Sequence, residues 1–261
     1  MFLVLKHKRL AMVKLASHKK KLLSMLGDIK GCNVLDYGCG RGDFVALLLN
    51  SKNKAQLIYA VDSSSEMIDT INSNFSKEIS SGVVITKIVS RPQSLEGQKF
   101  DKIICHNVLE CLEDKIKFIN QFDALLDNNG IFLLSHHDFD SAIFNSSYKE
   151  ITRKLVHYFS DTQQAWQEHC DGQMGRKIPG LINHSVFKNF ATCQTIRIVE
   201  TEFQPGNYGY LMADMLLSIA ESHYDANTIK KWYHDLEVLD KANEYYFAID
   251  LVVATIKRSK L

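Results

Sequence analysis

Short apolar runs alternate with amphipathic stretches from about residue 32 onward, and this alternation predicts an α/β fold. Stretches with helical spacing at 44–49, 65–77 and 115–126 separate most of the apolar runs. Strands joined by helices pair in parallel, so the pattern predicts a mostly parallel sheet with helices on both faces. The runs predicted as strands are 33–36, 57–61, 83–89, 101–105 and 131–134, the last one after a turn at 128–130.

The alternation stops after residue 137. Residues 138–190 show helical amphipathic spacing and no clear strand, which predicts a helical cap inserted over the sheet. Alternating residues return at 195–202, and the longest strand pattern follows at 245–256. The chain therefore divides into a basic N-terminal helical segment, 1–30, and a domain, 31–261, that carries the insertion at about 138–190. Two further helices are expected at 210–222 and 228–241.

The N-terminal segment is strongly basic. Residues 1–30 hold eight Lys or Arg residues against one acid, Asp28. Leucines recur there at helical spacing, which favours an amphipathic helix packed beside the domain with lysine stems along its apolar edge. A basic arm for RNA or an anionic surface is the alternative. The apolar stretch 2–5 is too short for a secretory signal.

Composition narrows the class of protein. The 261 residues are 46% hydrophobic and 23% charged, as in globular chains, and no apolar run is long enough to predict a membrane span. A net charge of +1 excludes a uniformly basic nucleic-acid binder. The six cysteines are scattered without a C-x-x-C pair, which predicts free thiols in a cytoplasmic protein and no metal site.

A glycine turn follows the first predicted strand. Residues 34–44 read Val-Leu-Asp-Tyr-Gly-Cys-Gly-Arg-Gly-Asp-Phe, with glycines spaced G-x-G-x-G and not the G-x-G-x-x-G of dinucleotide sites. Asp36 ends this strand, where a carboxylate would repel a pyrophosphate and attract an ammonium or sulfonium group. Asp62 ends the second strand, where an acid accepts the hydroxyls of a ribose. Gly38 and Gly40 allow a tight turn and close ligand approach.

Three segments, VLDYGCGRGDF (34–44), YAVDSSSEMI (59–68) and FDKIICHNVLECLED (100–114), resemble the class I S-adenosylmethionine-dependent methyltransferases. The resemblance implies a Rossmann-like seven-stranded sheet whose last strand is antiparallel, with S-adenosylmethionine across the strand ends. The stretch GRKIPGL (175–181) resembles small-molecule methyltransferases of the ubiquinone-biosynthesis-like group.

The resemblance also implies which residues meet the cofactor. Asp36, Gly38 and Gly40 would line its methionine part, and Cys105 and His106 would lie near its amino acid end. Ser90 and Arg91 stand where the family often has an acid that binds adenine, which is a departure from the family pattern. The remaining expected contacts are Asp62 and Ser63 at the ribose and Met67 against the adenine.

Methyl transfer to a hydroxyl or a protonated amine needs a proton acceptor near the reacting atoms. Histidine suits this role at neutral pH. His106 follows the fourth predicted strand, and His136 and His137 follow the fifth, so these three are the candidate catalytic residues.

The leading hypothesis is an enzyme that methylates an oxygen or nitrogen of a small molecule. One alternative is a tRNA or other RNA methyltransferase that binds the RNA phosphates with residues 1–30. Another is a non-catalytic, methyltransferase-like binding module. The oligomeric state is not indicated by the sequence.

Overall fold

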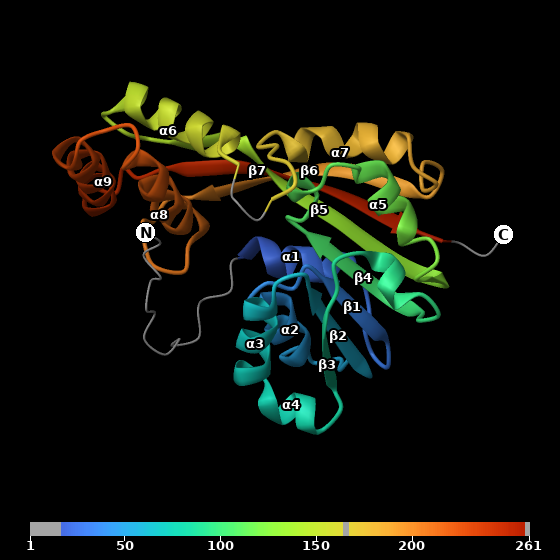
Figure 1. Ribbon diagram of the computed structural model, residues 1–261. Helices are drawn as coiled ribbons and strands as arrows, with labels where there is room; N and C mark the ends of the chain where they lie inside the picture. Colours follow the sequence, from blue (N-terminus) through green and yellow to red (C-terminus); the bar gives the residue numbers. More distant parts are fainter. Residues whose placement is uncertain (1–16, 164–166, 259–261) are drawn as a thin grey trace.

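The computed structural model describes residues 17–163 and 167–258. In that part of the chain seven strands form one sheet, with the order β3-β2-β1-β4-β5-β7-β6 (Figure 1). The strands are β1 (Asn33–Tyr37), β2 (Leu57–Asp62), β3 (Val84–Ile88), β4 (Phe100–His106), β5 (Leu126–Phe144), β6 (Ala191–Glu200) and β7 (Phe247–Lys257).

The strand directions match the predicted fold class. Strands β1 to β5 pair in parallel, and β7 is antiparallel to both β5 and β6. The expected Rossmann-like, mostly parallel sheet with an antiparallel last strand is therefore confirmed. Parallel pairing brings the carboxyl ends of β1, β2, β4 and β5 to one edge of the sheet, where ligands bind in open α/β folds.

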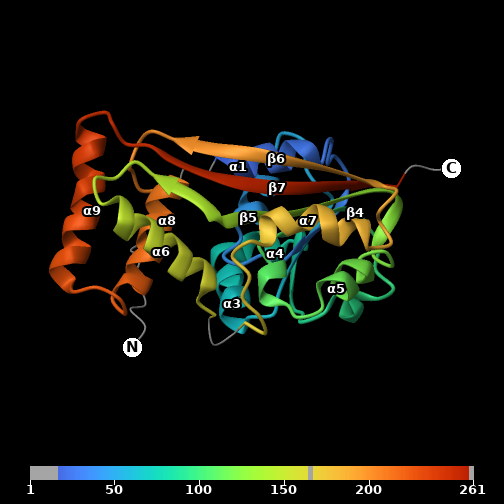
Figure 2. The same cartoon turned by 90° about the horizontal axis from the view of Figure 1, so that it is seen from above.

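Helices cover both faces of the sheet. Residues alternate between two apolar cores along each strand, so that Val34 packs in one core and Leu35 in the other. Helices α6, α8 and α9 gather at one end of β5, β6 and β7 (Figure 2). The helices are α1 (Ser17–Met25), α2 (Asp43–Leu49), α3 (Ser65–Asn74), α4 (Ser76–Ser80), α5 (Lys115–Gln121), α6 (Lys149–Asp161), α7 (Met174–Asn183), α8 (Tyr208–Ala220) and α9 (Ala226–Lys241), with single turns η1 (Pro92–Leu95) and η2 (Leu109–Cys111).

Strand β5 is longer than its sequence pattern indicates. It starts at Leu126, and its register against β4 shifts between Leu126 and Ile131, so the expected turn at 128–130 is a bulge within the strand. At its other end β5 continues to Phe144, because β7 pairs with it as far as Phe144↔Phe247.

The expected insertion therefore differs from the structure at its start. Residues 138–144 belong to β5, and the helical part begins at Lys149 with α6. Helix α7 packs on β5 and β7, so it covers a face of the sheet and is not a roof over the strand ends. Its buried side chains, Met174 and Ile178 among them, join the core beneath that face.

The basic N-terminal segment is helical over α1 and continues without helix to residue 30. Leu22 of α1 and Leu26, just after it, are buried and join the same apolar core as α2. Lys19 forms an ion pair with Asp43 of α2. Residues 1–16, which carry half of the predicted basic charge, lie outside the described residues. None of the described helices is long and apolar enough to cross a membrane.

Candidate functional site

The glycine turn after β1 is held against the end of β2. The backbone N–H groups of Gly38 and Cys39 both donate to the carbonyl oxygen of Val61, at 2.8 and 3.0 Å. Gly38 and Gly40 have φ values of +74° and +52°, in the left-handed region that glycine adopts at little cost. The turn therefore depends on glycine for its backbone shape.

Asp62 joins the two strand ends. Its Oδ2 accepts a hydrogen bond from the Gly40 N–H at 2.9 Å, and its Oδ1 accepts one from the Ser64 N–H at 3.0 Å. A carboxylate offers about four lone-pair sites, so each oxygen keeps capacity for a ligand hydroxyl. Asp62 thus shapes the glycine turn and remains able to bind a ribose.

Asp36 presents a buried carboxylate without a partner. It is 2% exposed, and its Oδ2 has no hydrogen-bond partner within the described residues. Burial raises the pKa of Asp36 to about 7, although the Lys19 charge opposes the rise. A cation beside this carboxyl would favour its ionised form. The amino group of S-adenosylmethionine fits that need.

Gly38 and Gly40 differ in what surrounds them. A Cβ on Gly38 would lie 2.3 Å from Cγ2 of Val108, so Gly38 is required for packing as well as for turn geometry. A Cβ on Gly40 would meet nothing within 4 Å. Gly40 therefore faces open space beside the turn, and the residues around the turn fit the predicted cofactor.

The other predicted cofactor residues lie in different surroundings. Ser63 and Ser90 are exposed, and Met67 is half-buried in the first turn of α3, which Ser64 caps. Arg91 is engaged with Glu168 through a 2.7 Å ion pair. Cys105 is completely buried in the apolar core, which raises its thiol pKa, so its side chain is a packing group.

His106 at the end of β4 and His137 within β5 come together, with ring centroids 5.2 Å apart. His136 and His137 were expected to follow the fifth strand, but they lie inside it because its pairing with β7 extends β5 to Phe144. His106 Nδ1 lies 2.9 Å from Ser135 Oγ. His137 Nδ1 lies 2.9 Å from Nδ2 and 3.2 Å from Oδ1 of Asn107, and this Oδ1 accepts the His137 backbone N–H at 3.0 Å. Asn107 holds this position with φ +55°, a strained conformation typical of functional sites.

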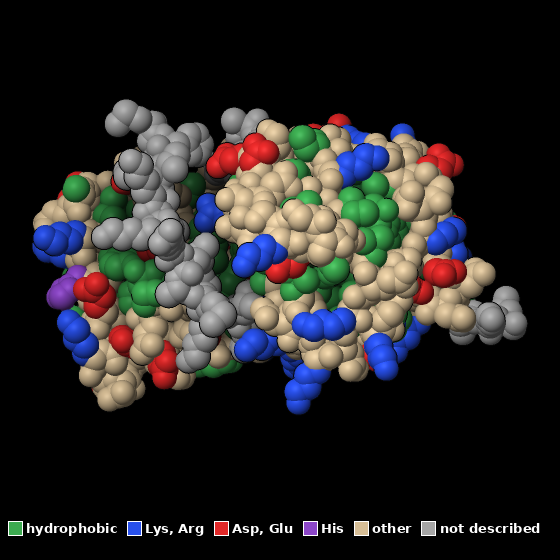
Figure 3. Space-filling model, turned by 90° about the horizontal axis from the view of Figure 1, so that it is seen from below, with side chains coloured by type: hydrophobic (Ala, Val, Ile, Leu, Met, Phe, Trp, Pro, Cys, Tyr) green, Lys and Arg blue, Asp and Glu red, His purple; other side chains and the backbone are tan. Residues whose placement is uncertain are grey.

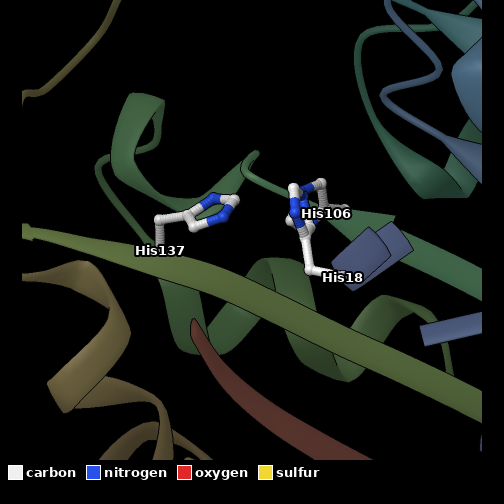
Figure 4. Close-up of side chains that lie close together, drawn as sticks. All are labelled: His18, His106 and His137. Atoms are coloured by element: carbon white, nitrogen blue, oxygen red, sulfur yellow. The ribbon is translucent and has the colours of Figure 1, made fainter. Parts of the chain in front are cut away.

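Two more rings complete the cluster, and Figure 4 shows the first of them, His18, with His106 and His137. His18 of α1 lies with its ring centroid 5.1 Å from that of His137, and it is 3% exposed. Tyr208 of α8 stacks on His137 with centroids 4.3 Å apart. His18 and Asn107 are not among the residues predicted from the sequence. His18 and Leu22 of α1 are buried together with Leu26 just after the helix, and a polar residue in this apolar row was the available signal.

His136 points away from the other two candidate histidines, because successive side chains on a strand face opposite sides. Its Nδ1 lies 2.7 Å from the carbonyl oxygen of His137, and its Nε2 lies 3.6 Å from Oε2 of Glu110. Burial lowers the pKa of His136 to about 4 and raises that of Glu110 to about 8. The pair is therefore neutral near pH 7. The structure brings His106 and His137 together and leaves His136 in a separate contact.

Comparison with known proteins shows the family to which the chain belongs. The family model for a methyltransferase domain matches residues 28–232, so the chain belongs to the methyltransferase-domain family. The resemblance to class I S-adenosylmethionine-dependent methyltransferases is thereby confirmed.

Curated relatives include the ubiquinone biosynthesis O-methyltransferase of Rickettsia felis, which is 30% identical over 117 residues, 44% of this chain and 46% of the relative. The chain thus matches about half the length of these relatives.

Solved structures share the fold. The YcgJ protein of Bacillus subtilis is 17% identical, with a TM-score of 0.56 over 93% of this chain and 99% of that protein. The Haemonchus contortus phosphoethanolamine N-methyltransferase 2, solved with phosphomonomethylethanolamine and S-adenosylhomocysteine, is 15% identical. Its TM-score is 0.54, over 93% of this chain and 52% of that one.

Proposed function

We propose that this chain transfers a methyl group from S-adenosylmethionine to an oxygen or nitrogen of a small molecule. One observation carries the proposal: the unpartnered carboxylate of Asp36 and the cluster around His106 lie at the ends of neighbouring strands. In the register of β1 with β4, Tyr37 pairs with Cys105, the residue before His106. A cofactor held at the glycine turn would thus have its reacting end near the histidines.

The cofactor contacts follow from the polar atoms at the turn. Asp36 would bind the amino group, and Asp62 would accept the ribose hydroxyls while it holds Gly40 in place. Gly40 leaves room for the ligand because it lacks a side chain. Met67, at the start of α3, would pack on the adenine. When bound, the cofactor supplies the reactive methyl group and the leaving group.

The reacting end is enclosed by aromatic and imidazole rings. Phe44 contacts the ring of His106 at a centroid distance of 5.7 Å, and Tyr208 covers His137. Burial lowers the pKa of His106 and His137, so both rings are neutral, and Nε2 of each is buried without a partner among the described residues. An Nε2 that carries the lone pair would accept the proton of an acceptor hydroxyl or amine.

A small acceptor suits this site better than RNA. Helix α1 lies over the strand ends, and its Lys19 is already paired with Asp43. Figure 3 shows Lys and Arg side chains interspersed with Asp and Glu on the face viewed there. The relatives named above act on small molecules by their names, which supports the same class here. All six cysteines are free, which supports a cytoplasmic location.

The test is calorimetric titration of the purified chain with S-adenosylhomocysteine, with NADH as the control ligand. Saturable micromolar binding of the first and none of the second is expected. Transfer of label from methyl-labelled cofactor into pooled small metabolites, compared with total RNA, then decides the acceptor class. Absence of S-adenosylhomocysteine binding would overturn the proposal.

A further inference from the structure

Three imidazoles from distant parts of the sequence meet at one point. His18 of α1, His106 at the end of β4 and His137 of β5 each offer a ring nitrogen, and these nitrogens lie within 4.8 Å of one another. Figure 4 shows the rings facing a shared space between the three elements. No carboxylate or thiol belongs to the group that the described residues form there.

The nitrogens that meet there lack hydrogen bonds. Nε2 of His106, Nε2 of His137 and both ring nitrogens of His18 are buried without a partner among the described residues. Leaving one buried polar group unsatisfied costs about 1–3 kcal/mol, so several at one point call for a shared ligand.

The remaining contacts orient the two histidines of the sheet. His106 Nδ1 lies against Ser135 Oγ, and His137 Nδ1 lies between Oδ1 and Nδ2 of Asn107. Metal binding at Nε2 requires Nδ1 to carry the proton, which His106 would donate to Ser135 Oγ and His137 to Asn107 Oδ1. Metal-binding histidines are held in this way, with the second nitrogen hydrogen-bonded to a neighbouring oxygen.

We propose that His18, His106 and His137 hold one divalent transition-metal ion, with Zn²⁺ as the best fit. Three neutral imidazoles suit zinc and its neighbours, whereas Mg²⁺ and Ca²⁺ prefer oxygen ligands. Three protein ligands leave a fourth position open, as in catalytic zinc sites. Tetrahedral zinc with Zn–N bonds of about 2.0–2.1 Å separates its nitrogens by about 3.3 Å, so the rings must draw closer than they lie here. His18 is the ligand on α1, and a shift of this helix would also move Leu22 in the apolar core and Lys19, which pairs with Asp43.

The open position gives the site a role in methyl transfer, a role that rests on the proposed function. An acceptor oxygen or nitrogen bound there would be placed beside the cofactor. A bound metal would lower the pKa of a coordinated hydroxyl, so the acceptor would release its proton to solvent at neutral pH and keep the oxygen lone pair for the methyl group. The acceptor class is then a small molecule with a metal-binding oxygen or nitrogen at the methylated position.

The experiment is a metal titration of the full chain after treatment with a chelator. Calorimetric titration with Zn²⁺ is expected to show one ion bound per chain. The same titration with Mg²⁺ is expected to show no binding. Co²⁺ is expected to give the strong visible bands of a tetrahedral site without the thiolate charge-transfer band that cysteine ligands would add. His18→Ala and His137→Ala are each expected to weaken zinc binding at least 100-fold. His184→Ala, which removes an exposed histidine at the end of α7, serves as the matched control and leaves it unchanged.

A second variant, which removes a smaller group, keeps the test informative if the alanine variants of the histidines fail to fold. Ser135→Ala removes only the hydroxyl beside His106 Nδ1, and loss of such a supporting contact weakens metal binding by about 10–100-fold. No saturable zinc equivalent in the wild type, or equal affinity in His18→Ala and the wild type, would overturn the metal site.

Titrating S-adenosylhomocysteine into the same samples separates the two proposals. Cofactor binding without zinc binding overturns the metal site alone. Zinc binding without cofactor binding supports the metal site and overturns the proposed function.

Discussion

The carboxylate of Asp62 accepts the backbone N–H of Gly40 at 2.9 Å, so the acid at the end of β2 fixes the turn at the end of β1. Its second oxygen accepts the Ser64 N–H at the start of α3. One side chain therefore organises the two segments between which a ribose would lie. Removing it is expected to affect turn geometry and ligand contacts together.

Asp62→Ala is expected to reduce S-adenosylhomocysteine affinity at least tenfold without unfolding the protein. The substitution also leaves two N–H groups without their acceptor, at a cost of about 1–3 kcal/mol in the free energy of unfolding. Calorimetry measures the affinity, and urea denaturation measures the stability. An affinity within twofold of the wild type would remove Asp62 from the site.

Gly40→Ala tests whether the cofactor occupies the open space beside the glycine turn. Its Cβ would enter a region without neighbours in the described structure, where the cofactor is proposed to lie. We expect reduced S-adenosylhomocysteine affinity together with the cost of about 1 kcal/mol that a non-glycine residue incurs in the left-handed region. Gly82→Ala is the matched control, because Gly82 also has a positive φ and open surroundings, but lies before β3. Equal affinities in the two variants would contradict the assignment.

Gly38→Val is a less direct probe of the cofactor. Its side chain would clash with Val108 before any ligand was bound, because a Cβ alone already comes within 2.3 Å. We expect this variant to lose several kcal/mol of stability along with its binding, as overpacked sites with strained backbones do. Thermal unfolding checks this expectation, and a wild-type melting temperature would show that the turn relaxes freely.

Cofactor affinity is expected to depend on pH through Asp36. Its pKa of about 7 in the folded chain means that the carboxyl is largely protonated below pH 7, and binding a ligand ammonium must then release that proton. Affinity should therefore rise by up to tenfold per unit as the pH increases toward 7, and level off above it. Lys19 favours the ionised form, while Asp43 and Asp62 oppose it. Calorimetry in buffers of different ionisation enthalpy measures the proton release.

The raised pKa of Asp36 also predicts how the free energy of unfolding depends on pH, and this dependence has the opposite sign to that of cofactor affinity. Because the folded pKa exceeds the unfolded one, the folded state holds the proton longer, and stability falls as the pH rises from about 4 to 7. Asp36→Asn should remove this slope and also flatten the pH dependence of cofactor affinity. A slope that persists in Asp36→Asn would assign it to another group.

His106→Ala and His137→Ala are expected to lower methyl transfer much more than cofactor affinity, because their Nε2 atoms face the reacting end. His136→Ala should affect stability first, since this ring packs against Phe139 and Glu110 on the other side of β5. Label transfer from methyl-labelled cofactor and S-adenosylhomocysteine titration, measured on the same three variants, check the difference. Unchanged transfer in both His106→Ala and His137→Ala would remove the cluster from the chemistry.

Most of the sheet and the glycine turn could be predicted from the sequence, because periodicity and glycine spacing are local properties. Strand ends and their acids follow directly from the strand assignments, so Asp36 and Asp62 were found together. The length of β5 was not predictable, since its extension to Phe144 depends on pairing with β7, more than a hundred residues later in the chain.

The sequence by itself determined the fold class and the glycine turn, and it offered His106, His136 and His137 as candidates, of which the first ends β4 and the other two lie within β5. Only the tertiary structure decided that His18 joins His106 and His137, and that His136 faces Glu110 instead. The pairing of Arg91 with Glu168 was likewise a matter of three-dimensional proximity. The physical reason is that local pattern fixes which residues share an element and a face, whereas packing between distant elements fixes which faces meet.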